Sequence, residues 1–398
     1  MATTMEQLRA WRGPALFSYG FRPFFFSGAV LAALLVAFWV PWFLGLIAIP
    51  SAFPPIAWHS HELLFGYVPA IVAGFLLTAV PNWTGRLPVV GRPLILLFSL
   101  WLAGRVAMLV SALLDPLLLA LLVLAFPVAL AAIIAREIVA GSNWRNLKVL
   151  TGVALLGVAQ ALFHYEIWRF GRAIHGDRLA IGATIMLIMI VGGRIVPSFT
   201  TNWLKRENPG RQPAVFGRFD LAAMIVAGAA LAAWVATPLH PALEAPAGVL
   251  LAAAGVLQAA RLARWAGDRT LAEPLVTVLH VAFAFVPAGF LLSGYALLAD
   301  DVGARSAGIH AWTAGAVGMM TLAVMTRATR GHSGRPLTAP LSTVLIYVAV
   351  FLAVLLRIAA AFLPEQSVAL LALAGTAWVL AFGGFAVAYG AMLLLPRP

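Results

Sequence analysis

The chain has 398 residues, of which 63% are hydrophobic and 10% charged, and its mean hydropathy is +0.97. A soluble globular protein has about 45–50% apolar and about 25% charged residues. This composition therefore excludes a soluble domain, a disordered protein and a nucleic-acid-binding module. Cysteine is absent, which also excludes disulfides, thiolate ligands and a cysteine nucleophile.

The apolar runs predict an all-α, polytopic membrane bundle with about twelve transmembrane helices. Each run has about 20 residues, is bounded by proline, glycine or charge, and is long enough to cross a bilayer. The runs lie near residues 24–47, 62–81, 93–114, 116–135, 147–168, 179–200, 219–237, 245–265, 274–298, 309–327, 341–363 and 367–394. No cleavable signal pattern precedes the first run. Twelve spans of about 21 residues use roughly 250 residues, so we expect 1–398 to form a single integral membrane domain.

The positive charges predict an orientation. The net charge of +12 comes from 26 Lys and Arg against 14 Asp and Glu. If the N-terminus is cytoplasmic, 19 of the 26 basic residues, from Arg9 to Arg397, fall in cytoplasmic segments, four fall outside and three lie within spans. The positive-inside rule then places both termini in the cytoplasm. Topology explains most of the net charge, and we expect no nucleic-acid partner.

Spans two, six and ten share a repeated sequence pattern. In spans two and ten a histidine is followed by residues of the same or similar type at offsets of 5, 23, 24 and 25. These residues are His61, Gly66, Thr84, Gly85 and Arg86 in span two, and His310, Gly315, Ser333, Gly334 and Arg335 in span ten. Span six carries a weaker copy from Asp177 to Thr200. We interpret this as a threefold repeat of four helices, over about 1–140, 141–268 and 269–398.

Ionisable residues within membrane spans are candidates for function, and histidine is densest in the segment His59-Ser60-His61-Glu62. Residues i and i+2 of a helix point about 200° apart. With Ser60 as N-cap, however, His59 would lie in extended chain and His61 in the first turn, so that both rings could approach one ion.

The expected orientation puts His164 and His310 at the same outer, periplasmic depth as His59 and His61. Imidazole-rich sites without thiolates suit haem iron, copper or zinc. The alternative is that each histidine only forms a hydrogen bond with a neighbour.

His280 lies about seven residues into span nine, roughly 10 Å from the inner face. Three roles stay open for it: axial ligand of a large cofactor, part of a second site, or a hydrogen bond between helices.

Three arginines are expected within spans: Arg105 and Arg357 in the outer half and Arg194 near the inner end. A guanidinium pairs with carboxylates through two hydrogen bonds, so haem propionates are natural guests. An ion pair with Glu62 or Glu166, or a bond to a carbonyl, is the alternative.

Several long blocks resemble the NnrS family. They are FRPFF (21–25), WHSHELLFG (58–66), GFLLTAVPNWTG (74–85), GRIVPSFTTN (193–202) and the stretch from His310 through MTLAVMTR (320–327) to GHSGRP (331–336). The resemblance runs discontinuously over nearly the whole chain.

This resemblance implies a twelve-span protein of the bacterial inner membrane that binds haem, expected to be b-type, and copper. It implies a role in nitric oxide metabolism or in resistance to nitrosative stress. Carried over by position, it makes His59, His61, His280 and His310 metal ligands, and His164 joins them from its expected depth. The supporting positions it implies are Arg22, Glu62, Arg194, Arg327, His332 and Arg335.

Three functions remain open at this point. The first is a haem and copper protein that handles nitric oxide without classical turnover. The second is a nitric oxide reductase-type enzyme, which would need an electron donor and a proton path. The third is a secondary transporter, whose central helices would be broken near the midplane. Pro41, Pro69, Pro127 and Pro287 are the candidates for such breaks.

Overall fold

The computed structural model describes residues 11–396, with the side chain of Asn82 left out. Arg9 and Arg397, which contribute to the expected orientation, lie outside this range. Residues 11–396 form helices joined by short loops and contain no strand. Twelve of these helical segments are long and apolar enough to cross a membrane, which confirms the all-α, polytopic fold expected from the sequence.

The observed spans match the apolar runs one for one, and most extend by a few polar residues at their ends. The sixth, for example, covers His175–Glu207 where hydropathy alone indicates 179–200. The twelve spans are Phe21–Phe43, Pro55–Pro81, Arg92–Leu109, Pro116–Ala140, Trp144–Phe170, His175–Glu207, Arg218–Leu239, Pro241–Arg269, Pro274–Ala299, Val302–His332, Leu341–Phe362 and Pro364–Leu394.

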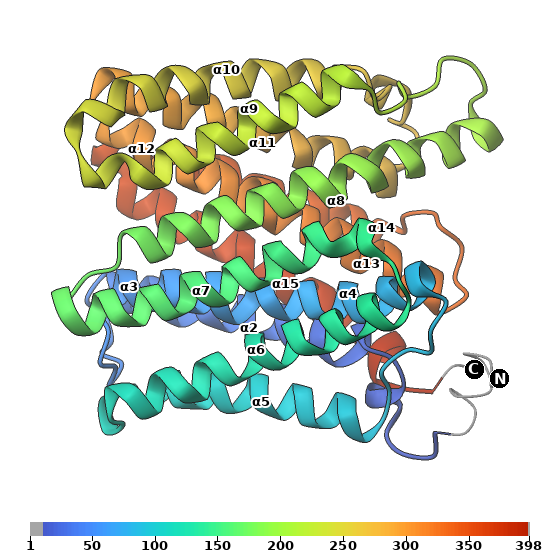
Figure 1. Cartoon of the computed structure of the whole chain (residues 1–398), viewed down its shortest axis with the longest axis horizontal. Coiled ribbons are helices and arrows are strands. Elements are labelled where there is room, and N and C mark those ends of the chain that lie inside the picture. The colour runs from blue at the N-terminus through green and yellow to red at the C-terminus, as the bar shows by residue number, and fades with distance from the viewer. Residues whose placement is uncertain (1–10, 397–398) are drawn as a thin grey trace. The chain divides into compact units, whose positions relative to one another are not determined.

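The chain divides into two compact units, and each is described by itself. Unit 1 comprises Met1–Ala183, Ala328–Arg335 and Phe382–Pro398, and unit 2 comprises Thr184–Arg327 and Pro336–Ala381. Three helices, labelled in Figure 1, have residues in both units. They are α8 (His175–Glu207), α13 (Met320–His332) and α15 (Ser367–Leu394).

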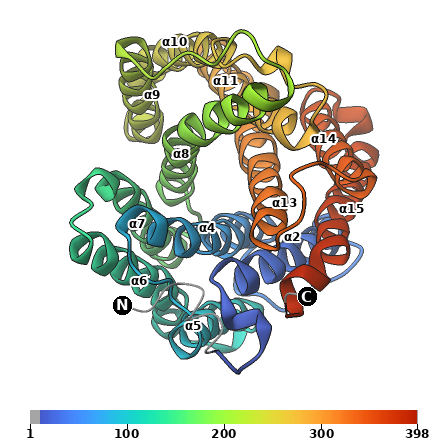
Figure 2. The same cartoon turned by 90° about the vertical axis from the view of Figure 1, so that its right-hand side faces the viewer.

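In unit 1, α5 packs against α6 and α6 against α7, while α2 packs against α4 (Figure 2). The core between them is aromatic: the ring of Phe24 lies 5.8 Å from that of Phe98 and 5.7 Å from that of Phe126. The complete helices of this unit are α2 (Phe21–Phe43), α3 (Pro55–His61), α4 (Val68–Thr84), α5 (Arg92–Leu109), α6 (Pro116–Ala140) and α7 (Leu147–Phe170).

In unit 2, α10 packs against both α9 and α11, and α12 packs against α11 and α14. Small residues permit the closest approaches: a Cβ at Gly294 would lie 2.9 Å from the carbonyl oxygen of Gly248 across α11 and α10. The complete helices of this unit are α9 (Arg218–Ala236), α10 (Glu244–Ala263), α11 (Pro274–Ala299), α12 (Val302–His310) and α14 (Leu341–Phe362).

Prolines begin helices here more than they break them. Pro116 and Pro274 each occupy the first turn of a helix, where the missing N–H would have no partner in any case. Helices α2, α6 and α11 continue through Pro41, Pro127 and Pro287. The broken helices that a transporter would need are therefore not found at these three prolines.

Two spans change their winding at the histidine of the repeated pattern. After α3 ends at His61, residues Glu62–Tyr67 wind as a π-helix before α4 begins. After α12 ends at His310, residues Ala311–Met319 do the same before α13. Such π-helical segments are rare and are frequent at functional sites. The repeated pattern of spans two and ten thus has a counterpart in local structure within each unit.

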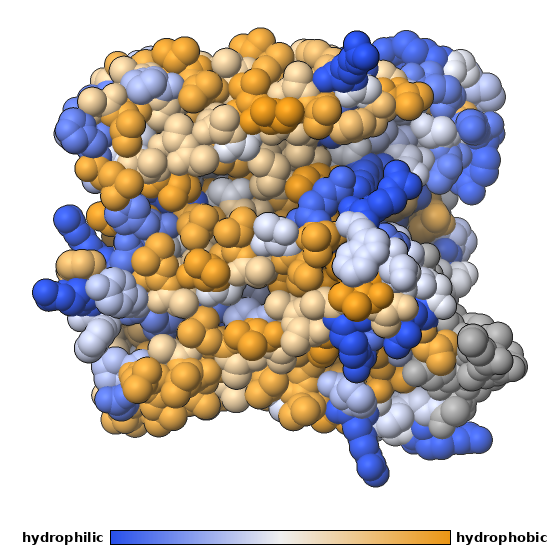
Figure 3. All heavy atoms as spheres, in the orientation of Figure 1, coloured by the Kyte–Doolittle hydropathy of each residue, from blue (hydrophilic) through white to orange (hydrophobic). Residues whose placement is uncertain are grey.

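Large apolar side chains cover the outer surface of the helices, as lipid contact requires. Figure 3 shows hydrophobic residues along the visible helices and hydrophilic residues gathered at their ends. Phe38, for example, is 54% exposed in the second half of α2.

At the other end of α2, the Arg22 guanidinium donates to the carbonyl of Leu395, just after α15, at 3.0 Å. The first span therefore begins where the last one ends, on one side of the membrane.

Candidate metal centre

The histidine-rich segment of span two is helical from Pro55 onward. Pro54 is extended, with φ −59° and ψ 154°, and Pro55 occupies the first turn, for which its fixed φ is well suited. Ser60 lies within the helix, and its hydroxyl donates to the carbonyl of Ala57 at 3.1 Å. The expectation that Ser60 caps the helix is therefore wrong, because the proline pair starts the helix five residues earlier.

Because both histidines are helical, they face different neighbours. The half-buried His59 ring stacks on Trp39 of α2, with the ring centroids 4.0 Å apart. The His61 ring is fully buried and packs among Phe53, Phe65 and Phe163 at centroid distances of 5.2–6.1 Å. The described structure thus does not bring His59 and His61 together around one point.

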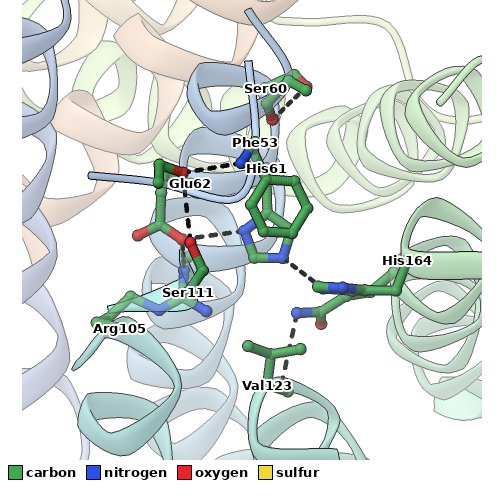
Figure 4. A network of polar contacts seen from close by, with 12 residues as sticks. Phe53, Ser60, His61, Glu62, Arg105, Ser111, Val123 and His164 are labelled. Atoms are coloured by element: carbon green, nitrogen blue, oxygen red, sulfur yellow. Dashed lines mark hydrogen bonds and ion pairs between the residues drawn. The ribbon is translucent and has the colours of Figure 1, made fainter. Parts of the chain in front are cut away.

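The partner of His61 is His164, which lies in the second half of α7. Their Nε2 atoms lie 3.0 Å apart, and His164 is 7% exposed. On the other edge of the ring, His61 Nδ1 lies 3.0 Å from Glu62 Oε1. Figure 4 shows His61 between Glu62 and His164. Sequence reasoning placed these two histidines at one depth, and the structure adds their direct contact.

Arg105 holds the buried Glu62 carboxylate from α5. Its Nη1 donates to Glu62 Oε1, and the two side chains are only 8% and 3% exposed. Gly66 in the π-helix makes room for the guanidinium, because a Cβ there would lie 2.5 Å from Arg105 Nη1. One turn earlier on α5, Trp101 donates to the carbonyl of Gly66 at 2.9 Å. For Arg105, the expected ion pair with Glu62 is what the structure shows.

This arrangement gives His61 a definite chemical role. A carboxylate paired with arginine accepts hydrogen bonds, so Glu62 favours the proton on His61 Nδ1 and leaves a lone pair on Nε2. That lone pair faces the Nε2 of His164. With no metal bound, His164 donates a hydrogen bond to His61. In the other tautomer of His164, with its proton on Nδ1, both Nε2 atoms present lone pairs to one small space.

Glu166, two residues beyond His164, has a structural role instead. It accepts hydrogen bonds from the backbone N–H groups of Ile174, His175 and Gly176 at 3.0–3.1 Å, and it lies 2.8 Å from His175 Nδ1. The first backbone N–H groups of a helix, here those at the start of α8, have no acceptor within the helix. Glu166 therefore caps α8, and no arginine pairs with it among the described ion pairs.

In unit 2, His280 bonds across two helices. Its Nε2 lies 2.8 Å from Thr200 Oγ1 of α8, and Thr200 in turn donates to the carbonyl of Val196 at 2.9 Å. Its buried Nδ1 has no hydrogen-bond partner, and a Cβ at Gly267 would lie 2.6 Å from it. Of the three roles left open by the sequence, the helix-to-helix hydrogen bond is present. Thr200 had no sequence signal that marked it as this partner.

His310 ends α12 in unit 2, and its Nδ1 donates to the carbonyl of Ser306 at 2.8 Å. The hydroxyl of the same Ser306 accepts a hydrogen bond from Arg357 Nη2 of α14 at 3.1 Å. His280 is remote from this end of α11. Gly308 touches Ser293, thirteen residues or about 20 Å along α11 from His280. His280 and His310 therefore do not share a site within unit 2.

The remaining supporting positions of unit 1 lie at the start of α2 and the end of α13. Arg22 is 4% exposed and donates to the carbonyls of Ala15 and Leu395, each at 3.0 Å. The half-buried His332 stacks on Phe21 with 5.3 Å between ring centroids. Arg335 is exposed.

The supporting arginines of unit 2 lie on α8 and α13. The Arg327 guanidinium carbon lies 4.1 Å above the Phe199 ring, a cation–π contact. Arg194 is exposed on α8.

Within residues 11–396, no group of three or more His, Asp or Glu side chains is arranged to hold a metal ion. Two possible ligands lie together at His61 and His164, with Glu62 orienting the first ring. The aromatic residues around the pair, Phe53 and Phe163, carried no sequence signal that separated them from ordinary packing.

Comparison with models of protein families gives a match to "NnrS protein" over residues 15–397. The match includes all five of the blocks that carry the resemblance to this family. No protein with a curated description matches the chain significantly.

Proposed function

The chain belongs to the NnrS family, and on that premise we propose that it handles nitric oxide inside the membrane through copper held by His61 and His164. Family membership and the twelve spans make it a multi-pass membrane protein with a nitric oxide-related function. The metal, its ligands and their place near the periplasmic face of a bacterial inner membrane are our proposal. The observation that carries it is the 3.0 Å separation of the two Nε2 atoms.

The donor set suits a copper ion. Imidazole nitrogens bind copper or zinc at about 2 Å, so two of them on one ion lie about 3 Å apart when their bonds are near a right angle. The separation of His61 and His164 matches this value. Glu62 orients the first ring from behind, as carboxylates commonly do for metal-bound histidine. Because only two donors converge, an ion held here would keep coordination positions open for a small ligand.

The same pair does not suit haem iron. A haem held by both histidines would need room for its porphyrin between the two rings. The Nε2 atoms of His61 and His164 lie 3.0 Å apart, and Phe53, Phe65 and Phe163 pack around the His61 ring. We therefore assign no haem to this pair.

We assign the haem to unit 2, at His310. Its Nδ1 proton is held by the Ser306 carbonyl, which fixes the tautomer in which Nε2 is the nitrogen that can bind a metal. His280 fits less well, because its Nε2 bonds to Thr200 and its Nδ1 lies against Gly267. His59 stacks on Trp39 and has no assigned ligand role in this proposal.

The residues of unit 1 would work as follows. Nitric oxide is a small apolar gas that enters the bilayer, and the three phenylalanines around His61 keep its surroundings free of bulk water. Arg105 fixes Glu62, and Glu62 fixes the tautomer and direction of His61. Copper bound by the two histidines would supply an open coordination position and a one-electron couple.

The test is metal content and spectroscopy of the purified protein before and after addition of nitric oxide. We expect copper in the wild type, a change in its EPR or optical spectrum with nitric oxide, and loss of copper in His61→Ala and in His164→Ala. His240→Ala, an exposed loop histidine, is the matched control and should keep its copper. Full copper occupancy in both site variants would overturn the assignment.

The haem is read independently in the same preparations. His310→Ala should lose or shift the haem absorbance, whereas His61→Ala should retain it. Unchanged haem in His310→Ala would overturn that ligand. Consumption of nitric oxide with an artificial reductant would identify the protein as a reductase-type enzyme, and binding without consumption would identify it as a handling protein.

A further inference from the structure

Spans two and ten carry the same local design, one in each unit. In each, a histidine is the last residue before a π-helix and a glycine follows five residues later. In each, the Nδ1 atom of that histidine has a fixed partner: Glu62 for His61 and the Ser306 carbonyl for His310. In each, an arginine from the following span reaches this partner residue.

The two copies differ in their negative charge. In unit 1 the arginine, Arg105, is paired with Glu62, which directly follows the histidine. In unit 2 the residue after the histidine is Ala311, and Arg357 instead donates to the neutral hydroxyl of Ser306. Among residues 11–396, no Asp or Glu forms an ion pair with Arg357.

Two acids near this end of unit 2 have other partners, and a third, Glu365 just after α14, is exposed. Asp301 caps α12 by accepting from the N–H of Ala304 at 2.8 Å. Asp300 lies 3.2 Å from Arg305 in an ion pair. Helix α14 itself contains no acidic residue. The chain therefore provides Arg357 with a hydroxyl and no countercharge within the described residues.

Arg357 lies inside a membrane span and not beyond its end. It is half-buried and five residues, or about 8 Å, before the last residue of α14. An arginine at such a depth is costly without an anionic partner. The close packing of α12 against α14 also permits the contact between Ser306 and Arg357. A Cβ at Gly303 would lie 2.7 Å from the carbonyl of Ala361, so α12 approaches α14 closely one turn from Ser306.

We propose that Arg357, with Ser306 and His310 on the same face of α12, binds an anion that comes from outside the chain. A guanidinium recognises carboxylates and oxyanions through two parallel hydrogen bonds, so the ligand is a carboxylate or a small oxyanion. Three sources offer this chemistry: a free oxyanion such as nitrite, the phosphate of a lipid headgroup, and the propionate of a haem ligated by His310. The anion site does not depend on the copper pair of unit 1.

The experiment measures the thermal unfolding temperature of the full chain, prepared without haem in an uncharged detergent. Sodium nitrite, short-chain phosphatidylglycerol and haem are added separately. A ligand that binds only the folded protein raises this temperature with increasing concentration. We expect at least one of the three to do so in the wild type, and the one that does identifies the source.

Two variants test the assignment, with one control. Arg357→Gln should abolish the ligand-dependent shift. Ser306→Asp should place a carboxylate beside the arginine, raise the unfolding temperature without ligand and abolish the response to it, so it remains informative if Arg357→Gln folds poorly. Arg305→Gln removes the half-buried arginine next to Ser306, which is paired with Asp300, and should respond like the wild type.

The proposal is overturned if none of the three anions shifts the wild type, or if Ser306→Asp retains the full response. Copper content is measured in every sample. Loss of anion binding with copper unchanged separates this site from the copper pair, and loss of copper in His61→Ala with anion binding unchanged does so in the other direction.

Discussion

Glu62→Gln is the sharpest test of how unit 1 is held together, because it removes one charge of a buried pair and almost no volume. The side chains of Arg105 and Glu62 are 8% and 3% exposed. Removal of one partner from such a pair leaves the other charge uncompensated and costs about 3–5 kcal/mol. An exposed pair, by contrast, contributes about 0–1 kcal/mol.

The measurement is the free energy of unfolding when a denaturing detergent is titrated into mild micelles, with the metal removed. Glu62→Gln and Arg105→Gln should each destabilise the protein by about 3–5 kcal/mol. The double variant should cost clearly less than the sum of the two, because neither charge is then left alone. Asp300→Asn is the matched control. It removes one charge of a pair whose side chains are 89% and 42% exposed, and it should change stability by less than about 1 kcal/mol.

A loss below about 1 kcal/mol in Glu62→Gln, or a double variant that equals the sum of the singles, would refute the reasoning. Copper binding gives a second readout of the same variant. With the carboxylate replaced by an amide, His61 loses the partner that fixes its tautomer, and affinity should fall about 10–100-fold.

Three further predictions concern packing, hydrogen bonding and orientation. Gly176→Ala should lower stability by about 1–3 kcal/mol and reduce copper binding in a metal assay, because its Cβ would lie 2.6 Å from a backbone nitrogen of α7. The control is Gly383→Ala, which should be tolerated because a Cβ there meets nothing within 4 Å. Equal effects of the two substitutions would contradict the packing argument. Thr200→Val should cost about 1–3 kcal/mol in the same unfolding assay by leaving the buried imidazole of α11 without a partner, and Thr200→Ser should restore most of it. Because the chain lacks cysteine, a single introduced cysteine reports the orientation of the chain without background labelling. A membrane-impermeant maleimide should label Ala242→Cys in intact cells and Val215→Cys only after the membrane is opened. The reverse pattern would contradict cytoplasmic termini.

The spans were predictable because a bilayer imposes its thickness on the sequence. Runs of about 20 apolar residues are typical of membrane helices and longer than a soluble core requires, and all twelve are found as helices. The pairing of Arg105 with Glu62 was among the expected outcomes for the same reason, since a charge within a span needs a partner nearby. Depth alone also placed His164 at the level of His61, which it contacts.

The local geometry of the site was less accessible. Ser60 is a good capping residue, but the helix begins five residues earlier, at Pro55. The sequence contains two signals for a helix start, the proline pair and the serine, and it does not show which of them is used. The π-helices after His61 and His310 have no sequence signature in the periodicity of such apolar runs. The His280–Thr200 bond joins residues eighty positions apart, and only the packing of α8 against α11 determines it. The threefold repeat stays a prediction.

The bond between Arg22 and the Leu395 carbonyl has a consequence for biosynthesis. Unit 1 contains Met1–Ala183 together with Ala328–Arg335 and Phe382–Pro398, whereas unit 2 is built from Thr184–Arg327 and Pro336–Ala381. A ribosome delivers the N-terminal segment first, so the opening spans must reside in the bilayer, with Arg22 still lacking this acceptor, until the last helix has been translated and inserted. A stop codon within α15 would thus damage the part of the protein that was made earliest.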